Sequence, residues 1–220
     1  MRVWIYESIS EMVEKIRRNF FQVLTHIGAW IPLLVGLWDL FQGNLGPDPI
    51  REATLRTGKT ALTLLFLSLA CTPIYTLFKF KPAIKMRRPL GVYSFMYASI
   101  HFAIFIGVDY FFNFEQIIDG LFEKRYAIVG LMTGLILLSL AITSTKGWQR
   151  RMKKKWKRLH RLAYVAGTLA VIHYIWLVKQ GVVEPWIWAG VLSLLFLMRL
   201  PQVKRVAGSF SRRLSLVFRV

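Results

Sequence analysis

Six stretches of about twenty mostly apolar residues restrict the folds open to this chain more than any other feature of the sequence. They lie at about 20–41, 59–78, 90–110, 126–144, 159–178 and 185–200. About twenty apolar residues in an α-helix cross a hydrocarbon core of roughly 30 Å. Hydrophobic residues make up 55% of the chain, and a soluble domain would struggle to hide that much apolar surface from water. The pattern predicts an all-α fold, a polytopic membrane helix bundle with six transmembrane helices.

Positive charge is concentrated on one side of the predicted membrane. Of the 30 Lys and Arg residues, 24 fall in the N-terminal segment, in the loops 79–88 and 146–161, and from residue 199 onward; the other 6 fall in the alternate loops. Cytoplasmic loops carry an excess of Lys and Arg, so both termini are expected in the cytoplasm. The net charge of +19 is therefore expected to meet membrane lipid, and no nucleic-acid partner is predicted.

The sequence divides into three regions. Residues 1–19 alternate apolar and charged positions and are expected to form an amphipathic helix at the membrane interface. Residues 20–200 contain the predicted spans, and residues 201–220 are expected to form a basic cytoplasmic tail suited to anionic lipid. No linker long enough to separate two domains and no internal repeat is evident in the sequence.

All four histidines lie within or at the edge of a predicted span: His26, His101, His160 and His173. An imidazole in a bilayer needs hydrogen-bond partners, so an intramembrane histidine usually marks function. At about 1.5 Å per residue, His101 lies about 17 Å and His173 about 21 Å from the cytoplasmic surface. This matched depth suggests that the two bind one haem as axial ligands. The residues alone leave open a second interpretation, in which the imidazoles only pin two helices together.

The other two histidines lie nearer the inner surface, His160 at its edge and His26 about 9 Å deep. They could ligate a second haem, although His160 could equally be an interfacial residue. Thirteen residues at about 100° each place His173 roughly 140° from His160 around the helix, which does not predict two haems on one stripe. Four arginines could pair with propionates or with a flavin phosphate in this region: Arg87, Arg88, Arg158 and Arg161.

Several smaller features bear on the site. Each ligand imidazole is expected to donate its N–H to a carbonyl or a hydroxyl, and Tyr97 and Ser99 are the candidates nearest His101 in the sequence. The segment "GLMTG" at 130–134 has the small residues that let helices approach closely. Cys71 is the single cysteine, so the chain has no intramolecular disulfide and no cluster of thiolate ligands.

Four motifs in fixed order resemble the MsrQ (YedZ) family, which is related to ferric reductase transmembrane domains. They are "RRPLGVYSFMYASIH" (87–101), "LAITSTKGWQRR" (140–151), "WKRLHRLAYVAG" (156–167) and "IHYIWLVK" (172–179). The resemblance runs from "THIGAW" at 25–30 to the sixth predicted span, nearly the whole chain. It implies a haem-binding subunit of a methionine sulfoxide reductase system in the bacterial cytoplasmic (inner) membrane.

The resemblance also implies partners and cofactors. Electrons would come from the quinone pool or from a cytoplasmic flavin reductase. They would pass to an extracytoplasmic molybdoenzyme, MsrP, which reduces methionine sulfoxide in oxidised exported proteins. One or two haem b groups and FMN are expected on the same basis, the FMN without assigned contacts. The chain carries no appended FAD or NADPH domain, so its reductant is expected to come from another molecule.

Carried across residue by residue, the family's principal haem b ligands match His101 and His173. Its additional histidine in the fifth span matches His160, which would belong to a second haem, and the role of its first-span histidine, matching His26, stays open. The histidines of the fifth span are one residue closer together than the wider ferric reductase pattern has them, which leaves the number of haems open.

Two other functions are alternatives for such a bundle: a membrane anchor for a redox partner without its own cofactor, and a proton-coupled transporter. A transporter predicts acidic residues deep in the spans, whereas Asp39 and Asp109 lie near span ends and the middles of the spans contain none. Paired carboxylates and a nucleophile–base arrangement are also missing from the spans. The sequence therefore favours a non-catalytic electron-transfer subunit.

Overall fold

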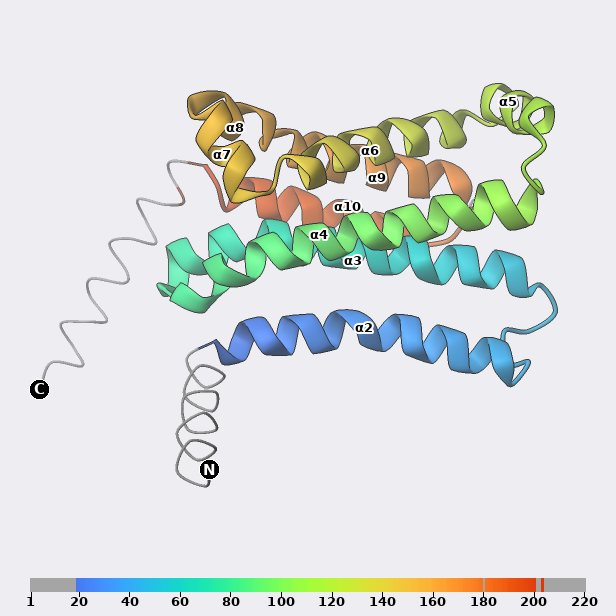
Figure 1. The fold of residues 1–220 in the computed structure, drawn as a ribbon, viewed down its shortest axis with the longest axis horizontal. Helices are drawn as coiled ribbons and strands as arrows, with labels where there is room; N and C mark the ends of the chain where they lie inside the picture. The colour runs from blue at the N-terminus through green and yellow to red at the C-terminus, as the bar shows by residue number, and fades with distance from the viewer. Residues whose placement is uncertain (1–18, 180, 201–202, 204–220) are drawn as a thin grey trace, which may run out of the picture.

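The computed structural model describes residues 19–179, 181–200 and 203, and the regular elements in this part of the chain are all helical (Figure 1). The expectation of an all-α fold is confirmed. In chain order the elements are α2 (Phe20–Phe41), α3 (Pro49–Phe78), α4 (Lys81–Ile104), the π-helix η1 (Phe105–Asp109), α5 (Phe114–Glu123), α6 (Arg125–Ile142), α7 (Lys146–Met152), α8 (Lys154–Leu159), α9 (Leu162–Leu177) and α10 (Glu184–Leu197).

Six apolar helices correspond to the six predicted spans. Within the described residues, four segments are long and apolar enough to cross a membrane: Phe20–Phe41, Pro49–Phe78, Lys81–Asp109 and Arg125–Ile142. The fifth and sixth stretches form α9, with 16 residues, and α10, with 14, so these two helices are about 24 and 21 Å long. The four long apolar segments make the chain a multi-pass membrane protein, and α9 and α10 run beside them (Figure 1).

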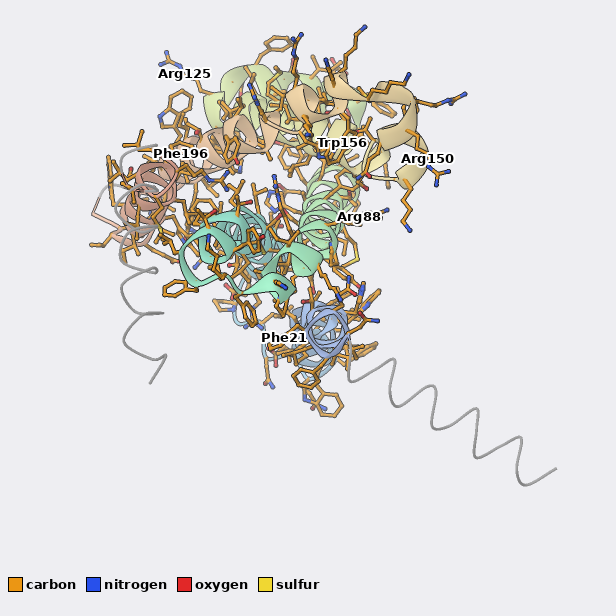
Figure 2. The ribbon with its side chains drawn as sticks, turned by 90° about the vertical axis from the view of Figure 1, so that its left-hand side faces the viewer. Phe21, Arg88, Arg125, Arg150, Trp156 and Phe196 are labelled. Atoms are coloured by element: carbon orange, nitrogen blue, oxygen red, sulfur yellow. The ribbon has the colours of Figure 1, made fainter. Side chains whose placement is uncertain are left out.

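The helices α3 and α4 occupy the middle of the bundle (Figure 1), with α6, α9 and α10 on one side and α2 on the other. Seen along the bundle in Figure 2, α2, which carries Phe21, stands apart from the upper group of helices. The larger buried cluster joins α3, α6, α9 and α10 through Leu62, Leu65, Phe66, Leu69, Leu137, Ala166, Val171, Tyr174, Leu192 and Leu195. The second lies chiefly between α3 and α4 and contains Ala61, Leu64, Cys71, Ala83, Leu90 and Tyr97.

The connection between α3 and α4 is much shorter than the basic loop expected at 79–88, so that expectation is wrong. Only Lys79 and Phe80 separate the two helices. Lys79 ends α3 in the left-handed conformation, with φ of 53°. Pro82 lies in the first turn of α4. Backbone N–H groups of the first turn have no partner within the helix, so the missing N–H of proline costs no helical hydrogen bond. Arg87 and Arg88 are therefore helical residues of α4.

The helix α3 also begins ten residues before its predicted span. Asp48 caps it by accepting a hydrogen bond from the N–H of Arg51 at 3.1 Å, and Pro49 occupies the first helical position. Arg51 and Arg56, which precede the predicted span, are consequently part of the helix. Hydropathy misses this turn because its residues are polar, although their capping pattern is typical of a helix start.

Pro73 interrupts the hydrogen-bond ladder of α3, and a side chain from elsewhere repairs it. Proline has no N–H, so the carbonyl of Leu69, four residues earlier, loses its helical donor. The Nη2 atom of Arg199, just after α10, donates to this oxygen at 2.6 Å. Backbone groups inside a membrane must be satisfied within the protein. The proline therefore creates a polar link between α3 and the end of α10.

The proline within α4 has a similar consequence. Pro89 leaves the carbonyl of Lys85 without its helical donor, and Nε2 of Gln22 on α2 donates to that oxygen at 3.3 Å. This contact joins α2 to the beginning of α4.

A third link lies beside Pro32 in α2. The hydroxyl of Tyr97 accepts from the N–H of Leu33 at 3.0 Å and donates to the carbonyl of Ala29 at 2.6 Å. Those two backbone groups would bond to each other in a regular α-helix, so the hydroxyl is inserted into the ladder. Tyr97 is only 1% exposed. This contact adds a second polar link between α2 and α4.

Three short helices lie at the two ends of the bundle (Figure 1): α7 and α8 at one end and α5 at the other. Asn113 caps α5 by accepting from the N–H of Gln116 at 3.2 Å. The apolar pattern of the sequence does not predict these helices. The expected interfacial helix at 1–19 lies outside the described residues except for Asn19, and the expected tail at 201–220 does so except for Val203.

Candidate functional site

His101 of α4 and His173 of α9 face each other across the bundle. Their ring centres are 6.2 Å apart and their planes lie at 87°. A metal–imidazole bond of about 2.0–2.1 Å, with the nitrogen roughly 1 Å from the ring centre, places two rings on opposite sides of one metal about 6 Å apart. The observed separation therefore matches that of two axial ligands on one iron.

The hydrogen bonds of the two imidazoles determine which nitrogen of each can bind a metal. Nδ1 of His101 lies 2.8 Å from the carbonyl oxygen of Thr54 on α3, and Nδ1 of His173 lies 2.7 Å from that of Tyr126 on α6. A carbonyl oxygen only accepts, so Nδ1 carries the proton in both rings. Each Nε2 is left with a free lone pair, as in a histidine metal ligand.

The two residues proposed as partners of His101 do not fill that role. Tyr97 donates its hydroxyl to Ala29, and Ser99 donates to the carbonyl of Phe95 at 2.9 Å in its own helix. The expectation of a carbonyl or hydroxyl partner is correct, but the candidates chosen are wrong. Ser99 lies two positions before His101, so the helix turns its side chain to another face. Tyr97 lies four positions before His101, on the same face, but its hydroxyl is bonded to the backbone of α2 instead.

Ion pairs surround the part of α3 that carries Thr54. Arg56 pairs with Asp39 of α2 and with Glu52 at 2.8 Å, and Lys59 pairs with Glu184 of α10 at 2.7 Å. These side chains are between 22% and 42% exposed. The charges near this end of the histidine pair are therefore compensated by their neighbours.

His160 lies apart from the His101–His173 pair. Its ring stacks on Trp156 with centres 4.0 Å apart, and its Nε2 lies 3.3 Å from the hydroxyl of Thr143. Thr143 donates its own proton to the carbonyl of Ser139 at 2.7 Å, so it accepts from Nε2. Nδ1 of His160 is consequently the nitrogen that remains available in this ring.

His26 lies on the exposed side of α2. Its Nδ1 is 2.9 Å from the hydroxyl of Tyr93 on α4, and the two rings meet edge to face at 5.6 Å. This contact explains the position of His26 by packing between helices. It does not bring the ring to either His101 or His173.

A group of positive charges occupies the end of the bundle where α4 begins. Arg87 is half-buried, Arg88 is exposed, and the charge of Arg87 acts on both Arg199 and His160. The guanidinium of Arg199 also lies 4.3 Å from the ring centre of Tyr164. No role is predicted for Arg199 from the sequence. The signal that could have revealed its contact was a basic residue at the end of a span, in a chain that also has a proline within a helix.

The described residues contain no group of three or more His, Cys, Asp or Glu side chains placed to hold a metal ion. The histidine pair could supply two ligands, and a group bound between them would bring the remaining coordination itself. Porphyrin supplies four nitrogens in a plane and leaves two axial positions. The donor set thus fits haem.

Comparison with known proteins places the chain in a broader context. Residues 57–171 match the family model described as "Ferric reductase like transmembrane component". The protein-methionine-sulfoxide reductase heme-binding subunit MsrQ of Xanthomonas euvesicatoria pv. vesicatoria is 43% identical over 180 residues, covering 79% of this chain and 83% of that protein. The MsrQ subunit of Rhodospirillum rubrum is 37% identical over 195 residues, covering 88% and 94%. No solved structure matches the chain.

Proposed function

The chain belongs to the MsrQ family of ferric-reductase-like membrane proteins, and on this premise we propose that it is a haem-binding electron-transfer subunit of a methionine sulfoxide reductase system. The observation that carries the proposal is the pair of imidazoles at 6.2 Å with both Nδ1 atoms bonded to carbonyls. The names of the relatives support haem as the bound group.

His101 and His173 would hold the haem iron through Nε2. Haem bound there would supply a one-electron redox centre. The carbonyls of Thr54 and Tyr126 hold each ring by its Nδ1–H. Bonds of this kind make an imidazole a stronger donor, which favours the oxidised metal.

The direction of electron flow is part of the proposal. The cytoplasmic end would be the one with the basic helices α7 and α8, in a bacterial inner membrane with both termini inside. A quinol or a cytoplasmic flavin reductase would donate electrons there. An MsrP-type molybdoenzyme would accept them outside and reduce methionine sulfoxide in oxidised proteins. The charge asymmetry of the sequence supports this orientation.

The organisation proposed for the chain follows from this function. Residues 20–200 would form the haem b domain, with 1–19 at the interface and 201–220 as a basic tail on the cytoplasmic side. A second haem near the inner surface would use His160, with His26 as a further candidate. Arg87 and Arg88 would meet anionic groups there, either propionates or the phosphate of FMN. Arg87 is half-buried and its charge acts on that of Arg199, which supports such a role.

The test is a measurement of haem in the purified full-length protein. We expect b-type bands in the reduced-minus-oxidised absorption spectrum, and loss of the contribution of the first haem in the His101→Ala and His173→Ala variants. His160→Ala and His26→Ala are the matched histidine variants, and neither should reduce the haem held by the first pair. Haem and flavin stoichiometry would separate one haem from two and detect FMN.

Two results would overturn the proposal. A colourless wild-type protein that still binds its redox partner would indicate an anchor without a cofactor. Unchanged b-type bands in both the His101→Ala and His173→Ala variants would remove these residues as ligands.

A further inference from the structure

Each of the two facing histidines rests on a neighbouring helix in the same way. Thr54 and Gly58 of α3 lie against His101, and Tyr126 and Gly130 of α6 lie against His173. In both units the glycine follows the carbonyl residue by four positions, and the histidine follows the carbonyl residue by 47. No repeat is evident in the sequence, whereas the structure shows this duplicated arrangement of three residues.

The glycine of each unit lies where the imidazole edge meets the helix backbone. A Cβ atom added to Gly58 would lie 3.1 Å from both Cε1 and Nδ1 of His101. One added to Gly130 would lie 2.8 Å from the same two atoms of His173. Real Cβ contacts almost never fall below 3.0 Å, so a side chain at Gly130 would displace the ring. Any such displacement would lengthen the hydrogen bond from Nδ1 to the carbonyl.

The position of each glycine in its helix explains the spacing of four. In an α-helix the N–H of residue i bonds to the carbonyl of residue i−4, so the carbonyl that receives the imidazole proton also faces the glycine. A ring that donates to this oxygen from outside the helix must pass over the glycine. A Cβ there would clash with the ring at Gly130 and crowd it more mildly at Gly58.

Packing between helices does not account for Gly130. The segment at 130–134 has small residues at both ends, which is typical of close helix contact. However, a Cβ on Gly134 would have nothing within 4 Å, whereas one on Gly130 would meet His173. Of the two glycines, only Gly130 therefore has a constraint on its size, and the imidazole imposes it.

We propose that Gly58 and Gly130 are positioning residues for the two axial imidazoles, one glycine for each ligand, and that together they hold the ring planes nearly perpendicular. This inference rests on the proposed haem-binding function. The relative angle of the rings is 87°. In low-spin ferric haem, the angle between axial imidazole planes controls the anisotropy of the electron paramagnetic resonance (EPR) signal. Ring orientation is therefore measurable in the loaded protein independently of electron-transfer activity.

The experiment compares Gly130→Ala and Gly58→Ala with the matched control Gly134→Ala in full-length protein purified in detergent. All three changes favour the helix, since alanine has a higher helix propensity than glycine by about 1 kcal/mol. Gel filtration and the unfolding midpoint in detergent would verify folding. Haem content, rate of haem loss, ferric EPR g-values and midpoint potential are then measured.

We expect Gly134→Ala to match wild type in all four measurements. Gly130→Ala should lose haem about tenfold more readily, the lower end of the about 10–100-fold cost of disturbing groups that orient a metal ligand. Gly58→Ala should retain haem better, because its added Cβ is less crowded, and should show changed g-values and a shifted potential. Because the contact at Gly58 is milder, the g-values of Gly58→Ala report ring orientation even if Gly130→Ala binds no haem.

The opposing outcomes are distinct. If Gly130→Ala and Gly58→Ala resemble Gly134→Ala in haem retention, g-values and potential, the positioning role is refuted while the haem function stands. If the wild-type protein carries no haem, both proposals fall.

Discussion

The contact between Arg199 and the carbonyl opposite Pro73 leads to a quantitative prediction about how the bundle is held together. Replacing Arg199 by methionine removes the donor to Leu69 and the cationic group above Tyr164. A hydrogen bond from a charged group is worth about 1.5–3 kcal/mol, and those measured between membrane helices are smaller, up to about 1.7 kcal/mol. A cation–π contact adds about 0.5–2 kcal/mol. We expect Arg199→Met to lower the free energy of unfolding by about 2–3 kcal/mol.

A double-mutant cycle isolates the hydrogen bond. In Pro73→Ala, residue 73 has an N–H that can bond to Leu69, so the arginine donor becomes redundant. Pro73 is less than 2% exposed, and the cavity that alanine leaves is common to both sides of the cycle. Arg199→Met should then cost only the cation–π part, giving a coupling of about 1–2 kcal/mol.

The assay is reversible unfolding in mixed micelles with a rising fraction of sodium dodecyl sulfate, followed by tryptophan fluorescence. Wild type, the two single variants and the double variant are compared under identical conditions. If the effects of the two substitutions are additive, Arg199 does not replace the missing proline N–H, and the explanation of this contact is wrong.

Three further predictions concern other contacts. Tyr97→Phe should lower stability by about 1 kcal/mol and increase hydrogen exchange at the amide of Leu33, since the hydroxyl is inserted into the ladder of α2; unchanged exchange would contradict this. Lys59→Met should lower the free energy of unfolding by less than about 1 kcal/mol, because both side chains of its ion pair with Glu184 are 42% exposed. The double variant Lys59→Glu with Glu184→Lys should recover most of that loss. Cys71, 3% exposed, should react with a water-soluble maleimide only after unfolding; rapid labelling of native protein would argue against the packing of α3.

The apolar pattern predicts the fold class well because a bilayer imposes a length on each hydrophobic stretch. It predicts helix ends poorly. Hydropathy counts the polar first turn of α3 and the start of α4 as loops, whereas capping by Asp48 and the short turn at Lys79 extend both helices. The amphipathic helix α5 was missed for the same reason, although Asn113 before it was a signal of a helix start.

Counting residues from the start of each predicted span gives the depth of each histidine in the membrane. His101 and His173 lie at similar depths, and this is sufficient to select them as a pair. Their hydrogen-bond partners could not be selected in that way. Both are backbone carbonyls, which any residue supplies, so the identities of Thr54 and Tyr126 carry no information about the contact. In each unit the contact restricts the identity of the glycine, so the glycine can be recognised in the sequence. The equal spacing from Gly58 to His101 and from Gly130 to His173 was therefore the usable signal.

The most direct test of the account is an experimental structure of the purified, coloured protein that resolves the space between α4 and α9. We expect density for an iron centre with Nε2 of His101 on one side and Nε2 of His173 on the other, each ring still donating Nδ1–H to its carbonyl. A structure in which haem is ligated by other residues, or in which these two imidazoles contact only protein, would contradict it.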